Sequence, residues 1–339
     1  MGDYRKAGIE ISLGGSYRLR TPNIAELLGG QENVMLKLEQ YYNQPYQPVA
    51  DPDELRMGEA STLVASQYNL LADKVNRLCW ISGSQALNLV KIPSTLKHIA
   101  EKAKEDPAYW GKMKYAALSG MSVTEAMKSL RGYYENLNEG GLIATISSSE
   151  FPHIPEFMKE AESWLVHLRT GRKYVKVICI VDPECLCEII RNGLIDSVSS
   201  YQMPLRPWTK NSVDYWRKEK TLTGYDAVTL MNETGGWPCL ISPILESGQK
   251  MPALNSLTAN DFIPSAPEAL HIVETMCALD GEPCPEDDLV ELIGIPNGMT
   301  REGIRNHIEA LKILHVLREP PKGLLLDSIA ASVICGASS

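Results

Sequence analysis

The sequence predicts an α/β protein with a parallel sheet covered by helices on both faces, and two observations predict it. Residues 173–183, KYVKVICIVDP, form a nearly continuous run of apolar residues, which is typical of a strand buried on both faces in a parallel sheet. Shorter strand candidates at 78–82, 140–149 and 199–205 alternate with helical periodicity over residues 60–210. Strands that alternate with helices indicate a three-layer domain.

The composition is that of a folded protein without a large basic surface. Its 339 residues are enough for two or three domains, and 44% of them are hydrophobic while 22% are charged. The net charge of −9 opposes a broad nucleic-acid surface, because phosphate binding needs clustered Lys and Arg. The sequence has no apolar run near the roughly 20 residues that cross a bilayer and no signal-peptide core. We therefore expect a cytoplasmic protein without membrane contacts.

The cysteines predict free thiols and no metal site. A free Cys in an apolar run behaves as a small hydrophobic side chain, and four lie in such runs: Cys79, Cys179, Cys239 and Cys277. Cys185 and Cys187 form a C-x-C pair, and no second Cys or His pair stands at a spacing typical of zinc ligands.

The first 40 residues predict a hairpin and one helix. Residues 8–30, GIEISLGGSYRLRTPNIAELLGG, indicate strand, Gly-Gly turn, strand and a short helix. Such a unit does not fold alone, so residues 1–40 are expected to be the end of a preceding domain. Residues 41–58 contain three prolines among polar residues and are typical of a linker.

Residues 59–210 are expected to form the α/β domain. The strands named above are separated by helical patterns at 60–73, 92–104, 109–137, 155–168 and 184–193. Ser122 and Glu125 have the spacing of a capping box, in which the Ser hydroxyl and the Glu carboxylate satisfy backbone N–H groups at the start of a helix.

The remaining residues are mainly helical and end in a hairpin. Residues 211–262 predict helices, and residues 263–339 predict helix, turn, helix, turn, helix and hairpin. That order is typical of a winged helix-turn-helix, with Thr300–Leu314 in the position of the recognition helix. Residues 315–336 repeat the design of residues 8–30. Residues 8–30 are therefore interpreted as the wing and last helix of an earlier winged helix, in a longer protein with repeated units.

Three stretches carry a resemblance to a known family. SYRLRTPNIAELLGG resembles the wing and exit helix of winged-helix domains attached to bacterial STAND and AAA+-type P-loop ATPases. PLRPWTKNSVDYWRKE resembles the end of their last sheet strand and the lid helix, and ETGGWPCLI is similar to their Gly-Gly-x-Pro lid motif. The resemblance implies a P-loop NTPase-like domain at 59–210, a helical lid at 211–262 and a winged helix-turn-helix domain at 263–339.

The phosphate-binding loop departs from the pattern of that family. A working P-loop needs glycines, a Lys for the β- and γ-phosphates and a Ser or Thr for Mg²⁺. WISGSQALN has Gln85, Ala86 and Leu87 where the Lys is expected, and three serines at 147–149 replace the acidic strand end that holds Mg²⁺. We therefore expect no catalytic residues, no metal site and no required cofactor. ATP or ADP would contact six residues: Gly83, Ser84, Gln85, Gly235, Gly236 and Pro238.

The helix-turn-helix pattern raises a DNA-binding alternative. The nucleic-acid contacts would come from five residues: Arg301, Arg305, His307, Lys312 and Lys322. Residues 265–323 hold two Lys and three Arg against eleven Asp and Glu, a net charge of −6. Binding by counterion release needs several unopposed cations, so the acidic charge disfavours DNA.

Three functional hypotheses follow. The favoured one is a non-catalytic regulatory or assembly module related to STAND and AAA+ signalling ATPases, with protein partners or further domains of a longer chain. The second is a winged-helix DNA-binding regulator. The third is a divergent ATP-binding or ATP-hydrolysing domain with Asp182 and Glu184 as metal-binding candidates.

Overall fold

The chain divides into two units, residues 1–49 and residues 50–339. The structure, a computed structural model, describes residues 9–11, 17–19, 74–105, 112–168, 171–196, 200–219, 226–247 and 254–336. In the first unit β1 (Ile9–Ile11) pairs antiparallel with β2 (Tyr17–Leu19), as the hairpin prediction requires. The predicted helix that follows this hairpin, the linker at 41–58 and the helix at 60–73 lie outside the described residues.

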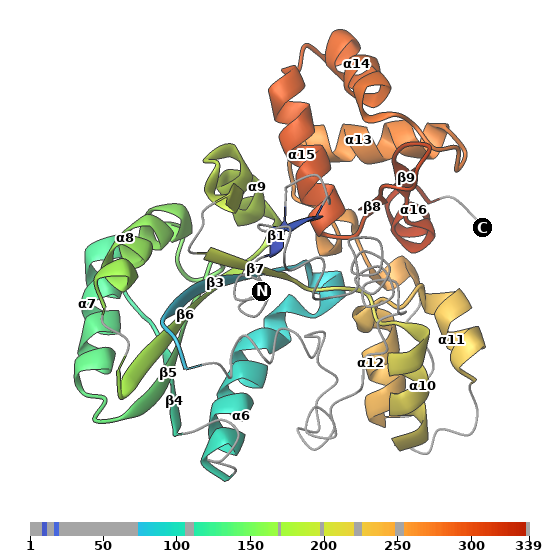
Figure 1. The fold of residues 1–339 in the computed structure, drawn as a ribbon. Helices are drawn as coiled ribbons and strands as arrows, with labels where there is room; N and C mark the ends of the chain where they lie inside the picture. Colours follow the sequence, from blue (N-terminus) through green and yellow to red (C-terminus); the bar gives the residue numbers. More distant parts are fainter. Residues whose placement is uncertain are drawn as a thin grey trace. The chain divides into compact units, whose positions relative to one another are not determined.

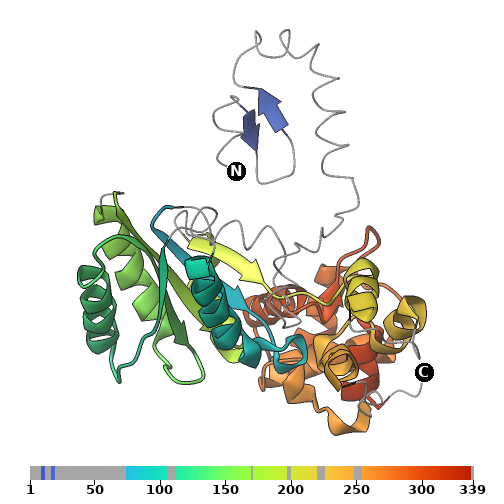
Figure 2. The ribbon, with the colours of Figure 1, turned by 90° about the horizontal axis from the view of Figure 1, so that it is seen from below.

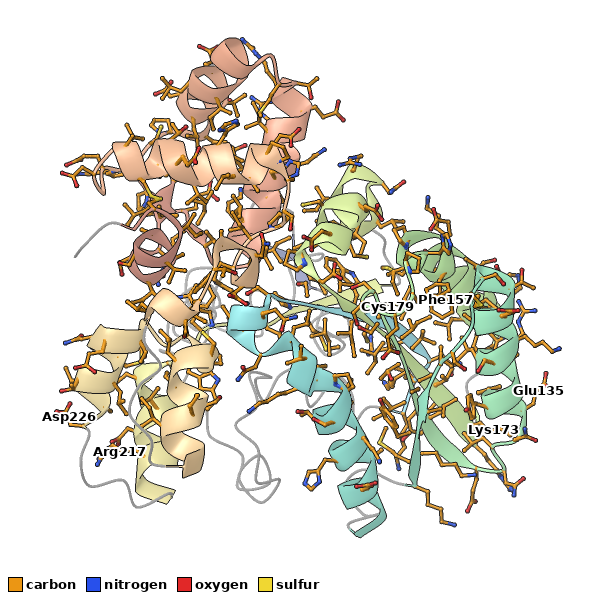
Figure 3. The ribbon with its side chains drawn as sticks, turned by 180° about the vertical axis from the view of Figure 1, so that it is seen from behind. Glu135, Phe157, Lys173, Cys179, Arg217 and Asp226 are labelled. Carbon is orange, nitrogen blue, oxygen red and sulfur yellow. A yellow bond between two sulfur atoms is a disulfide. The ribbon has the colours of Figure 1, made fainter. Side chains whose placement is uncertain are left out.

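The second unit contains a five-stranded parallel sheet of strand order β4-β5-β6-β3-β7. Its strands are β3 (Arg77–Ser82), β4 (Met113–Ala117), β5 (Gly140–Ser147), β6 (Lys173–Val181) and β7 (Ser200–Pro204). The central strand β6 is buried from Tyr174 to Val181, which confirms the prediction of a strand covered on both faces. In Figure 3 Cys179 of β6 and Phe157 of a covering helix lie in this core.

Helices cover both faces of the sheet, so the predicted three-layer α/β arrangement is confirmed (Figure 1). One face is covered by α6 (Ile92–Glu105) and the other by α7 (Val123–Glu135), α8 (Ile154–His167) and α9 (Pro183–Arg191). Figure 2 shows the sheet between α6 and the α7–α8 layer. The crossover from β3 to β4 runs toward one edge of the sheet, and the crossovers from β4 to β5, β5 to β6 and β6 to β7 run toward the opposite edge. Right-handed crossovers therefore place their helices on opposite faces.

The prediction of helix throughout residues 109–137 was wrong at residues 113–117, which form the edge strand β4. Met, Lys and Ala favour helices, but pairing with β5 and burial of Met113 and Ala116 outweigh that preference. The helix begins only at α7. There the Ser122 hydroxyl accepts a hydrogen bond from Glu125 N at 3.3 Å, and the Glu125 carboxylate accepts one from Met121 N at 2.7 Å.

Three helices follow the sheet in the segment predicted as a lid. They are α10 (Lys210–Glu219), α11 (Ala227–Thr234) and α12 (Pro238–Ser247). Trp208, Val213, Leu230 and Ile241 belong to a small apolar cluster of their own. Asp226 caps α11 by accepting hydrogen bonds from the N–H groups of Val228 and Thr229, and these bonds lower the pKa of its carboxyl group, as does nearby Arg217 (Figure 3).

The last 70 residues fold as three helices, a hairpin and a short helix, in the predicted order. The helices are α13 (Pro267–Ala278), α14 (Glu286–Asn297), α15 (Arg301–Ile313) and α16 (Ser328–Ile334). The hairpin strands are β8 (Leu317–Arg318) and β9 (Leu325–Leu326), and a single bridge joins Cys284 to Leu324. Apolar residues of this part belong to the same core as the sheet, so the two parts share one packed interior.

The prediction that Cys277 is a free thiol was wrong, because it forms a disulfide with Cys335. The two cysteines are 58 residues apart, and only the packing of α13 against α16 brings them together. The other six cysteines are free, in agreement with the prediction.

The turn between α11 and α12 depends on two glycines with left-handed backbone. Gly235 has φ 58° and ends α11, and Gly236 has φ 83°. The Gly236 carbonyl accepts a hydrogen bond from Trp208 N at 2.7 Å. A Cβ on Gly236 would lie 2.3 Å from the Trp208 carbonyl oxygen, so only glycine fits.

We predict that Gly236→Ala destabilises the protein more than Gly281→Ala. The φ angles are 83° and 81°, so left-handed backbone strain costs about 1–2 kcal/mol in either variant. Nothing lies within 4 Å of a Cβ on Gly281, whereas one on Gly236 would collide with backbone. Overpacking adds about 1–3 kcal/mol. Urea unfolding of both variants measures the difference, and equal losses would contradict the prediction.

Candidate functional site

The topology of the sheet marks one edge as the place for a site. Strand β3 lies between β6 and β7, and its crossover leaves toward the opposite face from that of β6. In open α/β sheets ligands bind beyond the carboxyl ends of the strands at such a switch point. The turn that follows β3 is also the segment that the sequence identifies as the position of a P-loop.

This turn consists of two short 3-10 segments. They are η1 (Gln85–Leu87) and η2 (Leu89–Lys91), with Asn88 between them at φ 59°. Gly83 N donates to the Val181 carbonyl at 3.2 Å, and Leu87 N donates to the Ser84 carbonyl at 3.1 Å. Helix α6 begins only at Ile92. The chain therefore turns tightly here and does not form a wide glycine-rich loop.

The turn is packed beneath α12. Ser84, Ala86 and Leu87 are fully buried, and η1 contacts both α12 and η5 (Ala259–Asp261). The Asn88 side-chain amide donates to the Ser242 hydroxyl of α12 at 2.9 Å. A phosphate-binding loop must present its backbone N–H groups to a ligand, whereas this turn presents its side chains to the protein core.

Gly83 has a packing explanation. A Cβ at this position would lie 2.7 Å from Leu205, the residue that follows β7. Leu205 is fully buried, and its N–H donates to the Ser82 carbonyl at 2.8 Å. The absence of a side chain at Gly83 therefore allows Leu205 to pack directly against the end of β3.

Ser84 is buried without a hydrogen-bond partner. Its hydroxyl is inaccessible, and so is that of Ser82 on β3. An unsatisfied buried hydroxyl costs about 1–3 kcal/mol relative to an apolar group of the same shape. Ser84 is thus present in the turn but lies away from solvent.

A cavity of about 310 Å³ lies beside this turn, at the carboxyl ends of β4, β5 and β6. Its polar lining residues are Gln85, Tyr115, Thr145, Ser147, Ser148, Ser149, Glu150 and Asp182. Several of these are already paired: Tyr115 Oη lies 2.9 Å from Thr145 Oγ1, and Ser147 Oγ lies 2.9 Å from Ser149 Oγ. Of the six residues predicted to contact nucleotide, only Gln85 lines the cavity.

The lining of the cavity is acidic. Asp182 and Glu150 are its charged residues, and none of the described residues that line it is a Lys, Arg or His. Asp182 Oδ1 accepts from Cys185 N at 2.9 Å and caps α9, and Asp182 N donates to Ser148 Oγ at 2.9 Å. The phosphates of a nucleotide would therefore meet carboxylates here, unless a cation came with them.

The metal pair suggested by the third hypothesis is not assembled. Glu184 accepts a hydrogen bond from Ser265 N at 3.0 Å, so its carboxylate is directed to the segment before α13. Within the ranges that the structure describes, no three His, Cys, Asp or Glu side chains are grouped as metal ligands. Asp182 and Glu184 thus have structural partners.

The glycine-tryptophan motif lies at another junction. Trp237 is fully buried, its ring packs edge-on against Phe262 at a centroid distance of 4.8 Å, and its Nε1 donates to Asp327 Oδ1 at 2.9 Å. A Cβ on Gly235 would lie 2.9 Å from Ile329 of α16. The lid motif therefore joins α12 to α16, and Gly235, Gly236 and Pro238 do not line the cavity.

His315 lies near the same junction and has an unusual environment. Its φ is 60°, and its Nε2 is buried without a partner. Burial, followed by the nearby Arg206 and Arg318, lowers the pKa of His315 to about 4. The ring is consequently neutral near pH 7 and is not a source of protons there.

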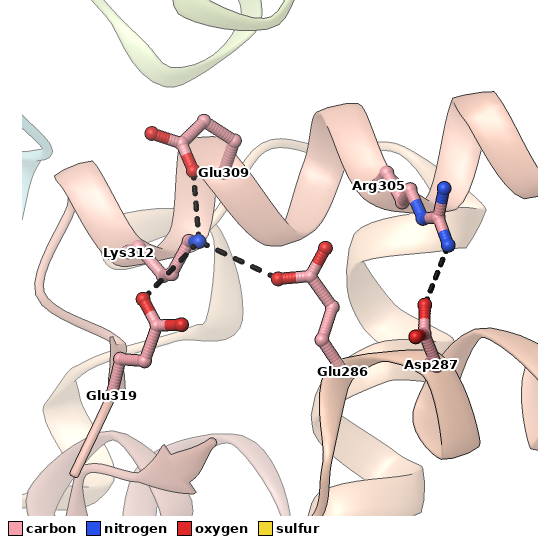
Figure 4. Close-up of polar contacts among 6 residues, drawn as sticks. All are labelled: Glu286, Asp287, Arg305, Glu309, Lys312 and Glu319. Atoms are coloured by element: carbon pink, nitrogen blue, oxygen red, sulfur yellow. Dashed lines mark hydrogen bonds and ion pairs between the residues drawn. The ribbon is translucent and has the colours of Figure 1, made fainter. Parts of the chain in front are cut away.

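Arg301, Arg305 and Lys312 are paired with carboxylates, and Figure 4 shows the pairs of Arg305 and Lys312. Arg301 lies 3.1 Å from Glu291, and Arg305 lies 2.6 Å from Asp287 of α14. Lys312 lies 2.9 Å from Glu309 and 3.5 Å from both Glu286 and Glu319, and these carboxylates raise its pKa despite the opposing effect of desolvation.

The two other predicted nucleic-acid residues differ from these. His307 is buried, and its Nδ1 lies 2.8 Å from the Gly303 carbonyl, so it is not available to bases. Lys322 is exposed in the turn between β8 and β9. In addition, α15 packs against α9 of the α/β domain. The recognition-helix position therefore faces protein on one side and carboxylates on another.

Comparison with known proteins gives likeness in architecture only. No family model matches the chain, and no curated protein matches it. Among solved structures, the ORC2 protein of Aeropyrum pernix, solved as ADPNP–ADP complexes, overlaps 86% of this chain and 93% of its own at 10% identity and a TM-score of 0.41. The Walker-type ATPase of Pyrococcus abyssi overlaps 79% of this chain and 93% of its own, at 10% identity and a TM-score of 0.37. A RuvB mutant of Thermotoga maritima overlaps 78% of this chain and 89% of its own, at 10% identity and a TM-score of 0.32.

TM-scores this low carry no argument about function, so the chemistry of the site is argued from the residues of this chain alone. The parallel five-stranded sheet with helices on both faces is a three-layer α/β arrangement. In the described ranges no helix is both long and apolar enough to cross a bilayer.

Sequence reasoning missed the hydroxyl-lined wall of the cavity. Tyr115 lies on β4, which the sequence had assigned to a helix, and its hydroxyl meets that of Thr145 on β5. It also missed Asp327, which lies 90 residues from Trp237 along the chain. Asp327 does precede a short helix, so its capping role is readable from the sequence, but its tryptophan partner is not.

We predict that Ser84→Ala leaves the free energy of unfolding unchanged or raises it by up to about 1 kcal/mol. The substitution removes a buried hydroxyl that has no partner. Ser242→Ala is the matched comparison: it removes the acceptor of the Asn88 bond and should cost about 1 kcal/mol. Urea unfolding measures both. A loss above about 2 kcal/mol for Ser84→Ala would contradict the assignment.

Proposed function

We propose that this chain is a non-catalytic regulatory or assembly module related to STAND and AAA+-type signalling ATPases. It acts in the cytoplasm, through contacts between its own domains and with protein partners or further domains of a longer chain. In this proposal residues 59–210 are a P-loop NTPase-like domain, residues 211–262 are a lid, and residues 263–339 are a winged helix. Residues 1–40 are the end of a preceding winged helix.

The observation that carries the proposal is the packing of the turn after β3. A hydrolytic P-loop has a lysine and free backbone N–H groups at this point. Here Ala86 and Leu87 are fully buried, and α12 is tied to the turn by the Asn88–Ser242 hydrogen bond. The position that would bind phosphates serves instead as a contact between the α/β domain and the lid.

The strand ends support the same conclusion. Where a metal-binding carboxylate would follow β5, Ser147 and Ser149 bond to one another. Asp182 at the end of β6 caps α9, and Glu184 accepts from Ser265 N. Asp182 and Glu184 are thus already engaged in contacts that stabilise the fold.

A nucleotide held without hydrolysis remains part of the proposal. The cavity beside Gln85 has about 310 Å³, near the lower end of the range of small-molecule sites. Its acidic lining means that ATP or ADP would bind there as a Mg²⁺ complex, with the cation offsetting the carboxylates of Asp182 and Glu150.

We predict no phosphate release from ATP above the uncatalysed background. Isothermal titration of the full chain with Mg²⁺–ATP and Mg²⁺–ADP measures binding, and a phosphate-release assay measures turnover. If binding is seen, Gln85→Ala should weaken it several-fold because Gln85 lines the cavity. Glu188→Ala, on the exposed face of α9 and outside the cavity, should leave it unchanged.

Turnover lost on Ser84→Ala or Asp182→Asn would contradict the non-catalytic assignment. Asn at an N-cap preserves the hydrogen bond to the helix. Asp182→Asn therefore removes the charge without removing the cap of α9. Such a result would favour the hypothesis of a divergent ATP-hydrolysing domain over that of a regulatory module.

DNA binding is the second candidate function, and one observation favours it. The chain has the helix order and hairpin of a winged helix-turn-helix, with Lys322 exposed in the hairpin turn. The ion pairs of Arg301 and Arg305 with α14 oppose it, because DNA phosphates would have to displace carboxylates.

We predict no mobility shift of duplex DNA at low salt, and no change on Arg301→Ala with Arg305→Ala. The matched comparison is Asp287→Asn with Glu291→Gln, which leaves the two arginines in place and removes their partners. If paired charge is what prevents binding, this variant should show weak, salt-sensitive binding. A salt-dependent shift by the unmodified chain that the arginine variants abolish would establish the DNA-binding alternative.

A further inference from the structure

The Cys277–Cys335 pair is the one disulfide among the described residues, and it is not fully buried. It joins the last turn of α13 to the residue that follows α16, and both cysteines are half-buried. Of the six free cysteines, Cys239 is half-buried and the others are buried.

Burial suppresses the reactivity of most of the free thiols. It raises the pKa of Cys187 and of Cys239 to about 12, and it raises the pKa of Cys179, Cys185 and Cys284 as well. Because the thiolate is the reactive form of cysteine, burial opposes thiol chemistry at these five positions near neutral pH.

The pair ties the carboxyl end of the short helix α16 covalently to α13. Helix α16 has seven residues, too few to be stable alone. Its first turn is held by Asp327 and by the buried Ile329 and Ala330. The following residues, Ala331 to Ile334, are half-buried; Val333 and Ile334 pack against the core, and the disulfide adds a covalent tie at that end.

The first turn of α16 is in turn connected to the lid. Asp327 Oδ1 accepts hydrogen bonds from Trp237 Nε1 at 2.9 Å and from Ile329 N at 3.0 Å, so one carboxylate oxygen joins both elements. Trp237 immediately precedes α12, and α12 holds the turn after β3 through Ser242. A continuous set of contacts thus runs from the disulfide to the turn beside the cavity.

We propose that the Cys277–Cys335 disulfide is a redox-controlled latch on the lid. In the oxidised chain it holds α16 against α13 and, through Asp327 and Trp237, holds α12 on the turn after β3. Reduction releases the carboxyl end of α16 and allows α12 to separate from that turn. The latch regulates the site of the proposed function, but its readout needs no nucleotide, so the two succeed or fail independently.

The chemical step is thiol–disulfide exchange with a dithiol reductant. One thiolate of the reductant attacks one Sγ of the pair, giving a mixed disulfide and a cysteine thiolate that takes up a proton. The second thiol of the reductant then displaces the remaining Sγ. Two electrons and two protons pass to the chain, which gains two thiols while the reductant becomes a cyclic disulfide.

The test compares the full chain oxidised and reduced with dithiothreitol, by hydrogen exchange followed by mass spectrometry. Reduction should speed exchange about tenfold or more in residues 328–335, and also in α12 and residues 84–91, because opening energies fall where a restraint is lost. Exchange in β5 and β6 should not change. Thiol titration in denaturant should find six free thiols before reduction and eight after.

Three variants separate the latch from a general loss of stability. Cys277→Ser with Cys335→Ser should show the reduced pattern under both conditions. Cys239→Ser, which removes a free half-buried thiol, should keep the full redox response. Trp237→Phe removes the Nε1–H donor to Asp327 and keeps an aromatic, though smaller, ring against Phe262. In this variant reduction should still speed exchange in α16 but no longer in α12.

Three results would overturn the proposal. Eight free thiols before reduction would show that the bond does not form. Identical exchange in the two redox states would show that the bond restrains nothing. A change confined to α16, with α12 and residues 84–91 unaffected, would show a local tie with no connection to the lid.

Discussion

The carboxylate of Asp327 is the interaction on which the joining of lid and carboxyl-terminal helices depends. One of its oxygens accepts from Trp237 Nε1 and caps α16, and the other pairs with Arg318 of β8. A buried carboxylate is costly unless its hydrogen bonds are satisfied. Its partners come from three parts of the chain, so the start of α12, the hairpin and α16 are held together by the hydrogen bonds of one carboxylate.

This arrangement accounts for the shape of the candidate site. Because Trp237 is anchored to Asp327 and packed on Phe262, α12 begins at a fixed point and covers the turn after β3. The turn is thereby closed on one side, and the cavity lies beside it, at Gln85 and the strand ends. What remains of a ligand site is small, acidic and lined with hydroxyl groups.

Much of the sheet could be predicted from sequence, because its inner strands carry their own signal. The Val and Ile run of β6 is apolar at nearly every position, and pairing on both sides buries it. Strand β4 carries no such signal: its residues favour a helix, and only pairing with β5 makes it a strand.

Glycine and tryptophan at 235–237 were recognised as a motif, but their contacts come from Trp208, Phe262 and Asp327, which are distant in sequence. The same limit explains the disulfide and the ion pairs of α15. Each joins residues whose proximity is a result of tertiary packing.

The burial of Ala86 and Leu87 has an evolutionary consequence. A lysine at either position would place an ammonium group beneath α12 with no described acidic partner at the turn, at a cost of several kcal/mol. A single substitution therefore cannot turn this segment into a phosphate-binding loop, since the turn, α12 and the Asn88–Ser242 bond would have to change together.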